Sequence, residues 1–82
     1  MSYRIVIEKP ALKSLQKQPR TQQERLLRAI QALPDVGDIK PMNGHENLYR
    51  LRVGSYRVIY TVEGNLLIVR VLTIGNRGDV YK

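Results

Sequence analysis

The sequence pattern of residues 49–60 predicts a regular β-hairpin. Apolar and polar residues alternate in the run YRLRV and again in YRVIY, which is the two-residue period of a β-strand. The two runs are separated by Gly54-Ser55, a pair typical of a type II′ turn. A turn of this length fixes the pairing of the two strands, so Arg52 is expected to lie directly opposite Arg57.

This hairpin brings like charges together. Arg52 and Arg57 share one face of the predicted sheet, and Arg50 lies two positions along the same face. Like charges in directly opposite positions destabilise a sheet, by a few tenths to about 1 kcal/mol. An anionic partner is the simplest reason for a sheet to keep three guanidinium groups together. We therefore interpret this face as a candidate anion-binding site.

Prolines mark the ends of two amphipathic helices before the hairpin. Pro10 suits the first turn of a helix over residues 10–18, and Pro19 breaks that helix and opens a second one over residues 19–33. Apolar residues recur at helical spacing in the second helix, which predicts one buried edge and one basic, solvated face. Pro34 ends this helix, because the residue before a proline avoids the helical conformation.

The rest of the chain is expected to form a sheet. A strand begins near Tyr3, and the hairpin is followed by a returning strand over residues 66–74. The loop over residues 34–47 leaves open a short strand around Ile39. The predicted fold class is α+β: an N-terminal strand, a two-helix hairpin and a three-stranded antiparallel meander, with the helices packed on one face of the sheet. We expect one domain, residues 1–82.

Alternation along the predicted strands separates a core face from a mixed face. The core face takes three tyrosines and most of the aliphatic residues, so we interpret Tyr49, Tyr56 and Tyr60 as packing residues. Arg70 of the returning strand falls on the mixed face with the hairpin arginines. A three-residue loop or a bulge before Arg70 would shift that placement.

The balance of charge also indicates an anionic partner. Fourteen Lys and Arg residues against seven Asp and Glu give a net charge of +7. Such a balance is typical of proteins that bind nucleic acid, a ribosome, an anionic membrane surface or an acidic protein, and a merely soluble basic protein is the plain alternative. No apolar run is long enough to span a membrane, and the N-terminus lacks the features of a signal peptide.

The sequence implies neither a metal site nor a cofactor. It has no cysteine, which excludes a disulfide scaffold and suits a reducing cytoplasm, the expected location. His45 is the only histidine, and the seven carboxylates show no ligand spacing. His45 and its neighbour Glu46 invite an acid/base interpretation, but an exposed loop position is the plainer one.

The segments LYRLRVGSYRVIY and IGNRGDVYK, behind a strand and two helices, resemble the RelE-type toxins of bacterial toxin–antitoxin systems. The resemblance covers nearly the whole chain, and the arginine after Ile74-Gly75 with a tyrosine near the end favours the RelE branch of the RelE/ParE superfamily. It implies a metal-independent, ribosome-dependent endoribonuclease. Such a toxin enters the ribosomal A site and cuts mRNA there by attack of a 2′-hydroxyl on the adjacent phosphate, which inhibits translation.

The resemblance also implies site residues. The catalytic set is Arg50, Arg52, Arg57, Arg77 and Tyr81. The RNA-binding set is Arg50, Arg52, Arg57, Arg70 and Lys82. Guanidinium groups suit this chemistry, because they bind phosphate oxygens in pairs and stabilise developing negative charge.

One departure from the best-known members concerns the proton acceptor. Those members carry lysines at the positions of Arg50 and Arg52, and an arginine cannot act as a base. Tyr81 is therefore the leading candidate for a general base or proton relay, provided that the arginines lower its pKa. Stacking on an RNA base is the other role open to Tyr81.

The resemblance implies three partners: an acidic cognate antitoxin that wraps the toxin, the ribosome with mRNA in its A site, and promoter DNA, which only the toxin–antitoxin complex binds. It implies no contact with a membrane. Two alternatives stay open. A ParE-like inhibitor of DNA gyrase, without nuclease activity, would use the same fold. An inactive nucleic-acid-binding module would bind RNA with strong salt dependence, although the arginine face lacks aromatic residues for base stacking.

Overall fold

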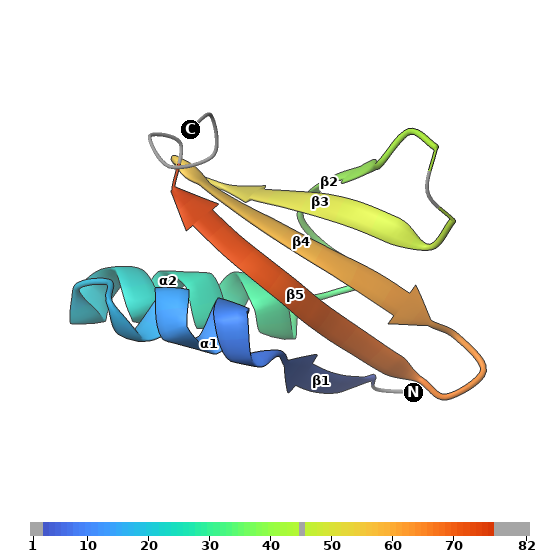
Figure 1. Ribbon diagram of the computed structural model, residues 1–82, viewed down its shortest axis with the longest axis horizontal. Helices are drawn as coiled ribbons and strands as arrows, with labels where there is room; N and C mark the ends of the chain where they lie inside the picture. Colours follow the sequence, from blue (N-terminus) through green and yellow to red (C-terminus); the bar gives the residue numbers. More distant parts are fainter. Residues whose placement is uncertain (1–2, 45, 77–82) are drawn as a thin grey trace.

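Two helices and five strands make up the part of the chain that the computed structural model describes, residues 3–44 and 46–76 (Figure 1). In chain order they are β1 (Arg4–Ile7), α1 (Lys9–Gln16), α2 (Arg20–Gln31), β2 (Asp38–Pro41), β3 (Leu48–Val53), β4 (Tyr56–Glu63) and β5 (Ile68–Asn76). Both helices lie where the prolines predicted them. None of the helices in this part of the chain is both long and apolar enough to cross a bilayer.

The strands form one sheet in the order β1-β5-β4-β3-β2. The pair β1 and β5 is parallel, and the other three pairs are antiparallel. This confirms the α+β class and the antiparallel meander, and it adds a strand to the predicted sheet. The option of a short strand around Ile39 is realised as β2, which pairs Ile39 with Leu51 and forms one edge of the sheet.

The hairpin of β3 and β4 has the predicted register. Val53 pairs with Tyr56, and Arg52 pairs with Arg57. Gly54 has a φ of 58°, which the first central residue of a type II′ turn requires and which glycine adopts without a steric penalty.

Two local features change the register that the sequence predicted for β5. The connection after β4 is a four-residue loop, because Glu63 pairs with Ile68, and Leu67 lies in that loop with a φ of 55°. A β-bulge then separates the pairs Ile59–Thr73 and Tyr60–Val71. The predicted returning strand over residues 66–74 therefore begins too early, because its first two residues belong to the loop and β5 begins at Ile68. Beyond the bulge the buried residue is Ile74.

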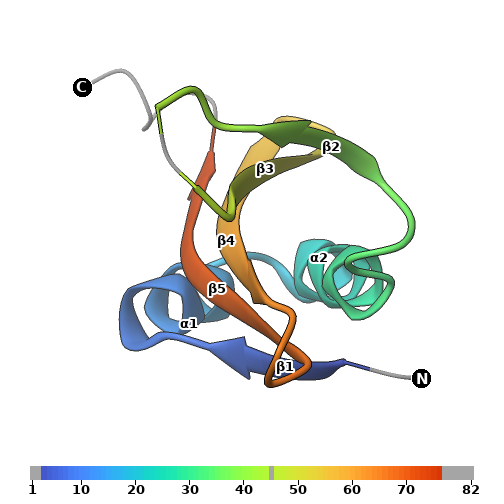
Figure 2. The ribbon, with the colours of Figure 1, turned by 90° about the vertical axis from the view of Figure 1, so that its right-hand side faces the viewer.

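The core lies between the helices and one face of the sheet (Figure 2). Each helix contributes residues with almost no exposed surface, and the sheet contributes alternate residues of β3, β4 and β5: Ala11, Leu15, Leu26, Ile30, Leu51, Val58, Tyr60, Val69 and Val71. The Tyr56 hydroxyl donates a hydrogen bond of 2.7 Å to Oε1 of Gln18, which ties β4 to the connection between the helices. The helices therefore occupy one face and leave the other face of the sheet to the alternate residues, which include the arginines of the hairpin as well as aliphatic residues such as Ile59.

Candidate functional site

Basic side chains collect on the sheet face that is turned away from the helices. In β3, Leu51 and Val53 are buried against the core, so their neighbours Arg50 and Arg52 point to the opposite face. Four basic residues of β2, β3 and β4 lie together on this opposite face, and we call the area that they form the cationic face. Its members are Lys40, Arg50, Arg52 and Arg57.

The register of the strands arranges these four residues as two adjacent pairs. Arg52 lies opposite Arg57, and we call them the arginine pair. Lys40 lies opposite Arg50, and we call them the edge pair because β2 is an edge strand. Directly opposite Cα atoms in an antiparallel sheet are about 4.5–5.5 Å apart, and the two pairs are two residues apart along β3, or about 6.8 Å. The result is a small area with four positive charges.

The neighbours of the arginine pair on the outer strands are small or acidic. Gly75 of β5 lies opposite Arg57 and has no side chain. Asp38 of β2 lies opposite Arg52. None of the ion pairs among residues 3–44 and 46–76 includes Lys40, Arg50 or Arg52. Three of the four charges on this face thus have no carboxylate of the described residues within salt-bridge distance.

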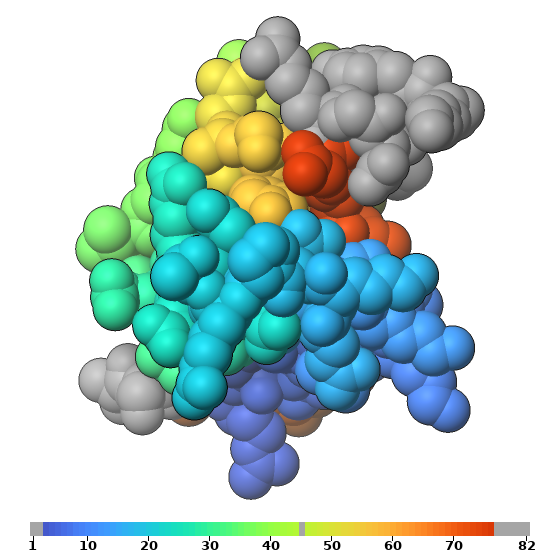
Figure 3. Space-filling view, turned by 90° about the vertical axis from the view of Figure 1, so that its left-hand side faces the viewer, coloured from blue at the N-terminus to red at the C-terminus, as the bar shows by residue number. Residues whose placement is uncertain are grey.

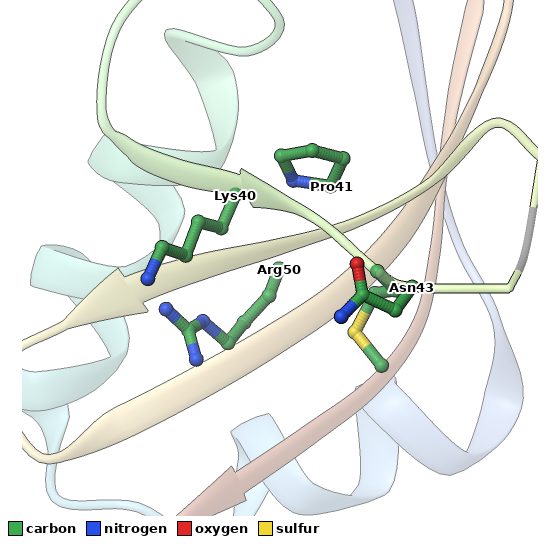
Figure 4. A pocket seen from close by; sticks show the side chains of 5 residues that line it. Lys40, Pro41, Asn43 and Arg50 are labelled. Carbon is green, nitrogen blue, oxygen red and sulfur yellow. The ribbon is translucent and has the colours of Figure 1, made fainter.

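A pocket of about 230 Å³ opens beside the edge pair (Figure 4). It is lined by Lys40, Pro41, Met42, Asn43 and Arg50, and no carboxylate is among these residues. The Nε atom of Arg50 is buried and has no hydrogen-bond partner in the described part of the chain. A buried donor without an acceptor is costly, so this position favours a ligand that can accept a hydrogen bond.

Lys40 is a site residue that the sequence prediction missed. The predicted loop over residues 34–47 includes Lys40, and only a short strand around Ile39, which the prediction left open, would place Lys40 in the sheet. In a strand, Ile39 packs against the core and its neighbours Asp38 and Lys40 take the other face. The alternation Asp38-Ile39-Lys40 was the available signal, but three residues are too few to establish a strand beside so many turn formers.

Arg70 lies on the same side of the sheet as the cationic face, but it is distant from the arginine pair and the edge pair. It pairs with Thr61, four residues along β4 from Arg57, or about 13 Å. Its guanidinium is 2.7 Å from a carboxylate oxygen of Glu63 and 3.1 Å from one of Glu8. The hydrogen bond from Arg70 lowers the pKa of Glu63, and the two carboxylates raise the pKa of Arg70. The guanidinium of Arg70 thus has an internal role.

The tyrosines of the hairpin serve the core, as predicted. Tyr60 is buried, and its ring stacks on Tyr49 with 5.6 Å between ring centroids. Burial, and then the proximity of Tyr49, raise the pKa of Tyr60 to about 12. Tyr60 is therefore a neutral phenol at physiological pH and cannot serve there as a base.

Helix α2 supplies a further guanidinium next to the hairpin turn. A Cβ atom on Gly54 would lie 2.9 Å from both terminal nitrogens of Arg25, so this side chain covers the turn. Figure 3 shows the surface of α2 directly below that of the hairpin tip. The sequence placed Arg25 on a solvated helix face, and the contact with the turn depends on how the helix docks.

Three of the predicted site residues lie outside the described residues: Arg77, Tyr81 and Lys82. His45, for which an exposed loop position was the plainer interpretation, also lies outside them. Asn76, which pairs with Tyr56, is the last described residue before the C-terminal three. Within the described part, no group of three or more His, Cys, Asp or Glu side chains is arranged to hold a metal ion. Arg50, Arg52 and Arg57 of the predicted catalytic set are thus brought together, while Arg77 and Tyr81 stay predictions.

Comparison with known proteins agrees with this architecture. Residues 5–81 match the family described as the ParE toxin of type II toxin–antitoxin systems, parDE. The chain is 30% identical over 88 residues to RelE1 of Methanocaldococcus jannaschii, which covers 100% of this chain and 98% of that protein.

Solved structures show the same fold with a partner bound. The RelE–RelB complex of Pyrococcus horikoshii contains a chain with a TM-score of 0.76 and 34% identity, over 95% of this chain and 98% of that one. The RelB–RelE antitoxin–toxin complex of Methanococcus jannaschii gives a TM-score of 0.74 and 29% identity, over 93% and 94% of the two chains.

Proposed function

Because the chain belongs to the RelE/ParE superfamily, as a RelE-like toxin of a type II toxin–antitoxin system, we propose that it is a ribosome-dependent mRNA endoribonuclease. It enters the ribosomal A site, cuts the message there and so inhibits translation. The observation that carries this proposal is the cationic face: four basic side chains lie in two adjacent pairs, and three of them form no ion pair with the carboxylates that the structure describes. That arrangement suits the phosphates of an RNA strand.

The proposed reaction uses the RNA's own nucleophile. The 2′-oxygen next to the cut attacks the phosphorus, its proton passes to a base, and the bond from phosphorus to the 5′-oxygen breaks. The 5′-oxygen gains a proton, which leaves a 2′,3′-cyclic phosphate and a 5′-hydroxyl. Negative charge builds up on the phosphate oxygens and on the leaving oxygen along the way. Fixed guanidinium groups stabilise that charge more in the transition state than in the ground state.

We assign the scissile phosphate to the arginine pair. Arg52 and Arg57 lie directly opposite each other, and two planar guanidinium groups can bind several phosphate oxygens at once. Arg50, one pair further along β3, binds the same strand.

The C-terminal residues complete the proposed site. Arg77 follows Asn76 directly in the sequence, and Tyr81 is five residues beyond Asn76, a length that spans at most about 17 Å. Tyr81 acts as the base, the proton relay or a stacking platform, since the arginines cannot accept a proton. Lys82 adds a further contact to RNA. Contact of Arg70 with RNA stays a prediction, and the structure gives its guanidinium two carboxylate partners instead.

The proposed partners follow from the same assignment. Two structurally similar toxins were solved in complex with their antitoxins. For this chain we propose an acidic antitoxin that wraps the toxin and brings carboxylates to the cationic face, and a toxin–antitoxin complex that binds promoter DNA. The site of action is the ribosome, in the cytoplasm.

A second candidate function is inhibition of DNA gyrase without nuclease activity. The observation in its favour is the match of residues 5–81 to the family named for the ParE toxin. Expression of the chain separates the two: arrest of translation with cut messages supports the ribonuclease, whereas DNA damage and filamentation with intact messages support the gyrase inhibitor. An inactive binding module would give neither phenotype.

The direct test is cleavage of a message on a programmed ribosome. The wild-type chain should cut the message in the A site and leave a 2′,3′-cyclic phosphate, and a 2′-deoxy sugar at the cut should abolish the product. Arg52→Ala and Tyr81→Phe should lower the rate strongly, while Lys13→Ala, an exposed charge on α1, should not. Cleavage by Tyr81→Phe and Arg52→Ala at the wild-type rate would refute the site, and no cleavage by the wild type would refute the activity.

A further inference from the structure

Lys40 and Arg50 lie side by side at the edge of the sheet and share a pocket. They are directly opposite each other in the β2–β3 ladder, and both line the pocket that also contains Pro41, Met42 and Asn43. Figure 4 shows the nitrogen ends of the two side chains pointing to the same side. We propose that this edge pair is a second phosphate-binding subsite, which holds the RNA phosphate next to the one at the arginine pair.

The first argument is charge. Two cations in a directly opposite pair repel each other, and the lining of the pocket offers them no carboxylate. The nearest acidic residue along β2 is Asp38, two positions away and opposite Arg52, and it forms no ion pair with Lys40 or Arg50. Binding of a phosphate would convert this repulsion into two attractive contacts.

The second argument is the unsatisfied donor of Arg50. Its Nε–H is buried and has no acceptor among the described residues. Buried donors are paired in the great majority of cases, so this atom indicates that an acceptor is supplied from outside. A phosphate oxygen meets that need, because the Nε–H and a terminal N–H of one guanidinium can bind two oxygens of the same phosphate.

The third argument is spacing. The edge pair and the arginine pair are two residues apart along β3, about 6.8 Å, which is comparable to the separation of successive phosphates in an extended RNA strand. Both pairs are on the same sheet face, so one strand can contact them in succession. The pocket is lined by one amide, one thioether and a proline besides the two cations. It has no aromatic ring on which a base would stack, so the ligand is the phosphate and not the base.

The inference rests on the proposed function for the identity of the ligand as RNA, but it assigns Lys40 a role that is separate from the chemical step. Lys40 is exposed, and its partner Arg50 is two residues along β3 from the arginine pair. It should therefore contribute to RNA affinity and to the register of the strand in the site. It should not change the rate of cleavage once the message is bound.

Binding of a short RNA that cannot be cut tests this subsite without any cleavage. The full-length protein is titrated at low salt with an oligonucleotide that has a 2′-deoxy sugar at the cut, and with a series in which one linkage at a time is a neutral methylphosphonate. We expect one linkage beside the 2′-deoxy position whose neutralisation weakens binding to the wild type by roughly threefold to tenfold. The same change should weaken binding to Lys40→Gln by a clearly smaller factor, because the contact with Lys40 is already absent and only the contact with Arg50 remains to be lost.

Two matched controls keep the test specific. Lys13→Gln removes one exposed charge from α1 and should keep the methylphosphonate effect. Only Lys40→Gln should reduce the slope of log affinity against log salt by roughly 0.7, the value for one lost contact to a single strand. In NMR spectra of the wild type, RNA should shift the Nε–H signal of Arg50, which Arg50→Lys identifies by its loss.

The outcomes separate this inference from the proposed function. Equal behaviour of Lys40→Gln and Lys13→Gln, or a methylphosphonate effect that is unchanged in Lys40→Gln, would overturn the second subsite even if the ribosome assay shows cleavage. Coupling between Lys40 and one linkage would support the subsite even if that assay shows no cleavage, and would then indicate an RNA-binding protein without the proposed activity.

Discussion

Arginines at the two ends of the same sheet face are treated in opposite ways. At one end, Arg70 contacts the carboxylates of Glu63 and Glu8 at 2.7 and 3.1 Å. At the other end, Arg50 and Arg52 have no carboxylate within salt-bridge distance among residues 3–44 and 46–76. The residue type and the face of the sheet are the same in both regions, so neither of them distinguishes a structural arginine from a proposed ligand-binding one. The difference lies in the counter-charges that the fold provides.

The contrast has a simple energetic meaning. Arg70 joins the end of β4 to the junction between β1 and α1, because its two partners come from those segments. The arginine pair and the edge pair instead collect like charges, which costs stability. This contrast supports the proposal that the end of the sheet with Arg50 and Arg52 binds an anion.

The largest expected effect is on cleavage by Arg52→Ala. Loss of one preorganised positive group at the phosphate should lower the cleavage rate roughly 100-fold or more. The melting temperature should stay equal or rise slightly, since a repulsive pair with Arg57 is removed. Rates from the ribosome assay and melting curves of the same preparation check this, and a large loss of stability would show that Arg52 is structural.

The turn that holds the arginine pair in register gives the next effect. Gly54→Ala should destabilise the protein by about 1–3 kcal/mol, because a side chain is strained at a φ of 58°. The new Cβ would also displace the guanidinium of Arg25. Gly64→Ala is the matched control, since nothing lies within 4 Å of a Cβ there and its φ is not in the left-handed region. Denaturant unfolding of both variants measures the difference, and equal stabilities would contradict it.

Arg70→Gln sharpens the comparison from the other end. It should leave cleavage close to wild type and lower stability, because Glu63 and Glu8 lose their shared partner. The pKa of Glu63 is lowered in the folded state, so its contribution is present above the ordinary carboxyl pKa and is lost as the pH falls. The melting temperature of the variant should therefore fall less steeply than that of the wild type as the pH is lowered into the acid range.

The smallest effect concerns Tyr60. Its pKa is about 12 in the folded state, above the usual value near 10, so the folded state holds that proton more tightly. The stability associated with it is full below pH 10 and is lost as the pH rises toward 12. Tyr60→Phe should be less sensitive to that pH range than wild type, whereas an identical alkaline limb in urea unfolding would contradict the assignment.

Much of the fold was predictable because short-range rules decide it. Pro10, Pro19 and the Gly54-Ser55 turn fix the helix boundaries and the hairpin register, and the register alone places Arg52 opposite Arg57. The bulge beside Tyr60 and the four-residue loop before β5 depend on how two strands fit across the sheet, and no local signal identifies them.

The candidate site was predictable only in part, for the same reason. The hairpin arginines follow from alternation, but Lys40 enters through an edge strand of four residues whose existence depends on pairing with β3. The carboxylate partners of Arg70 come from segments distant in sequence, since Glu8 is 62 residues away. Tertiary contacts of this kind decide which charges are neutralised, and a sequence pattern does not contain them.

The most direct measurement compares three preparations in one ribosome assay that detects 2′,3′-cyclic phosphate ends: wild type, Arg52→Ala and Arg70→Gln. We expect rapid cleavage by the wild type and by Arg70→Gln, and a rate that is lower by roughly 100-fold or more for Arg52→Ala. Equal losses in the two arginine variants, or messages without cyclic ends in the wild type, would contradict the claim that the end of the sheet with Arg50 and Arg52 binds and breaks RNA.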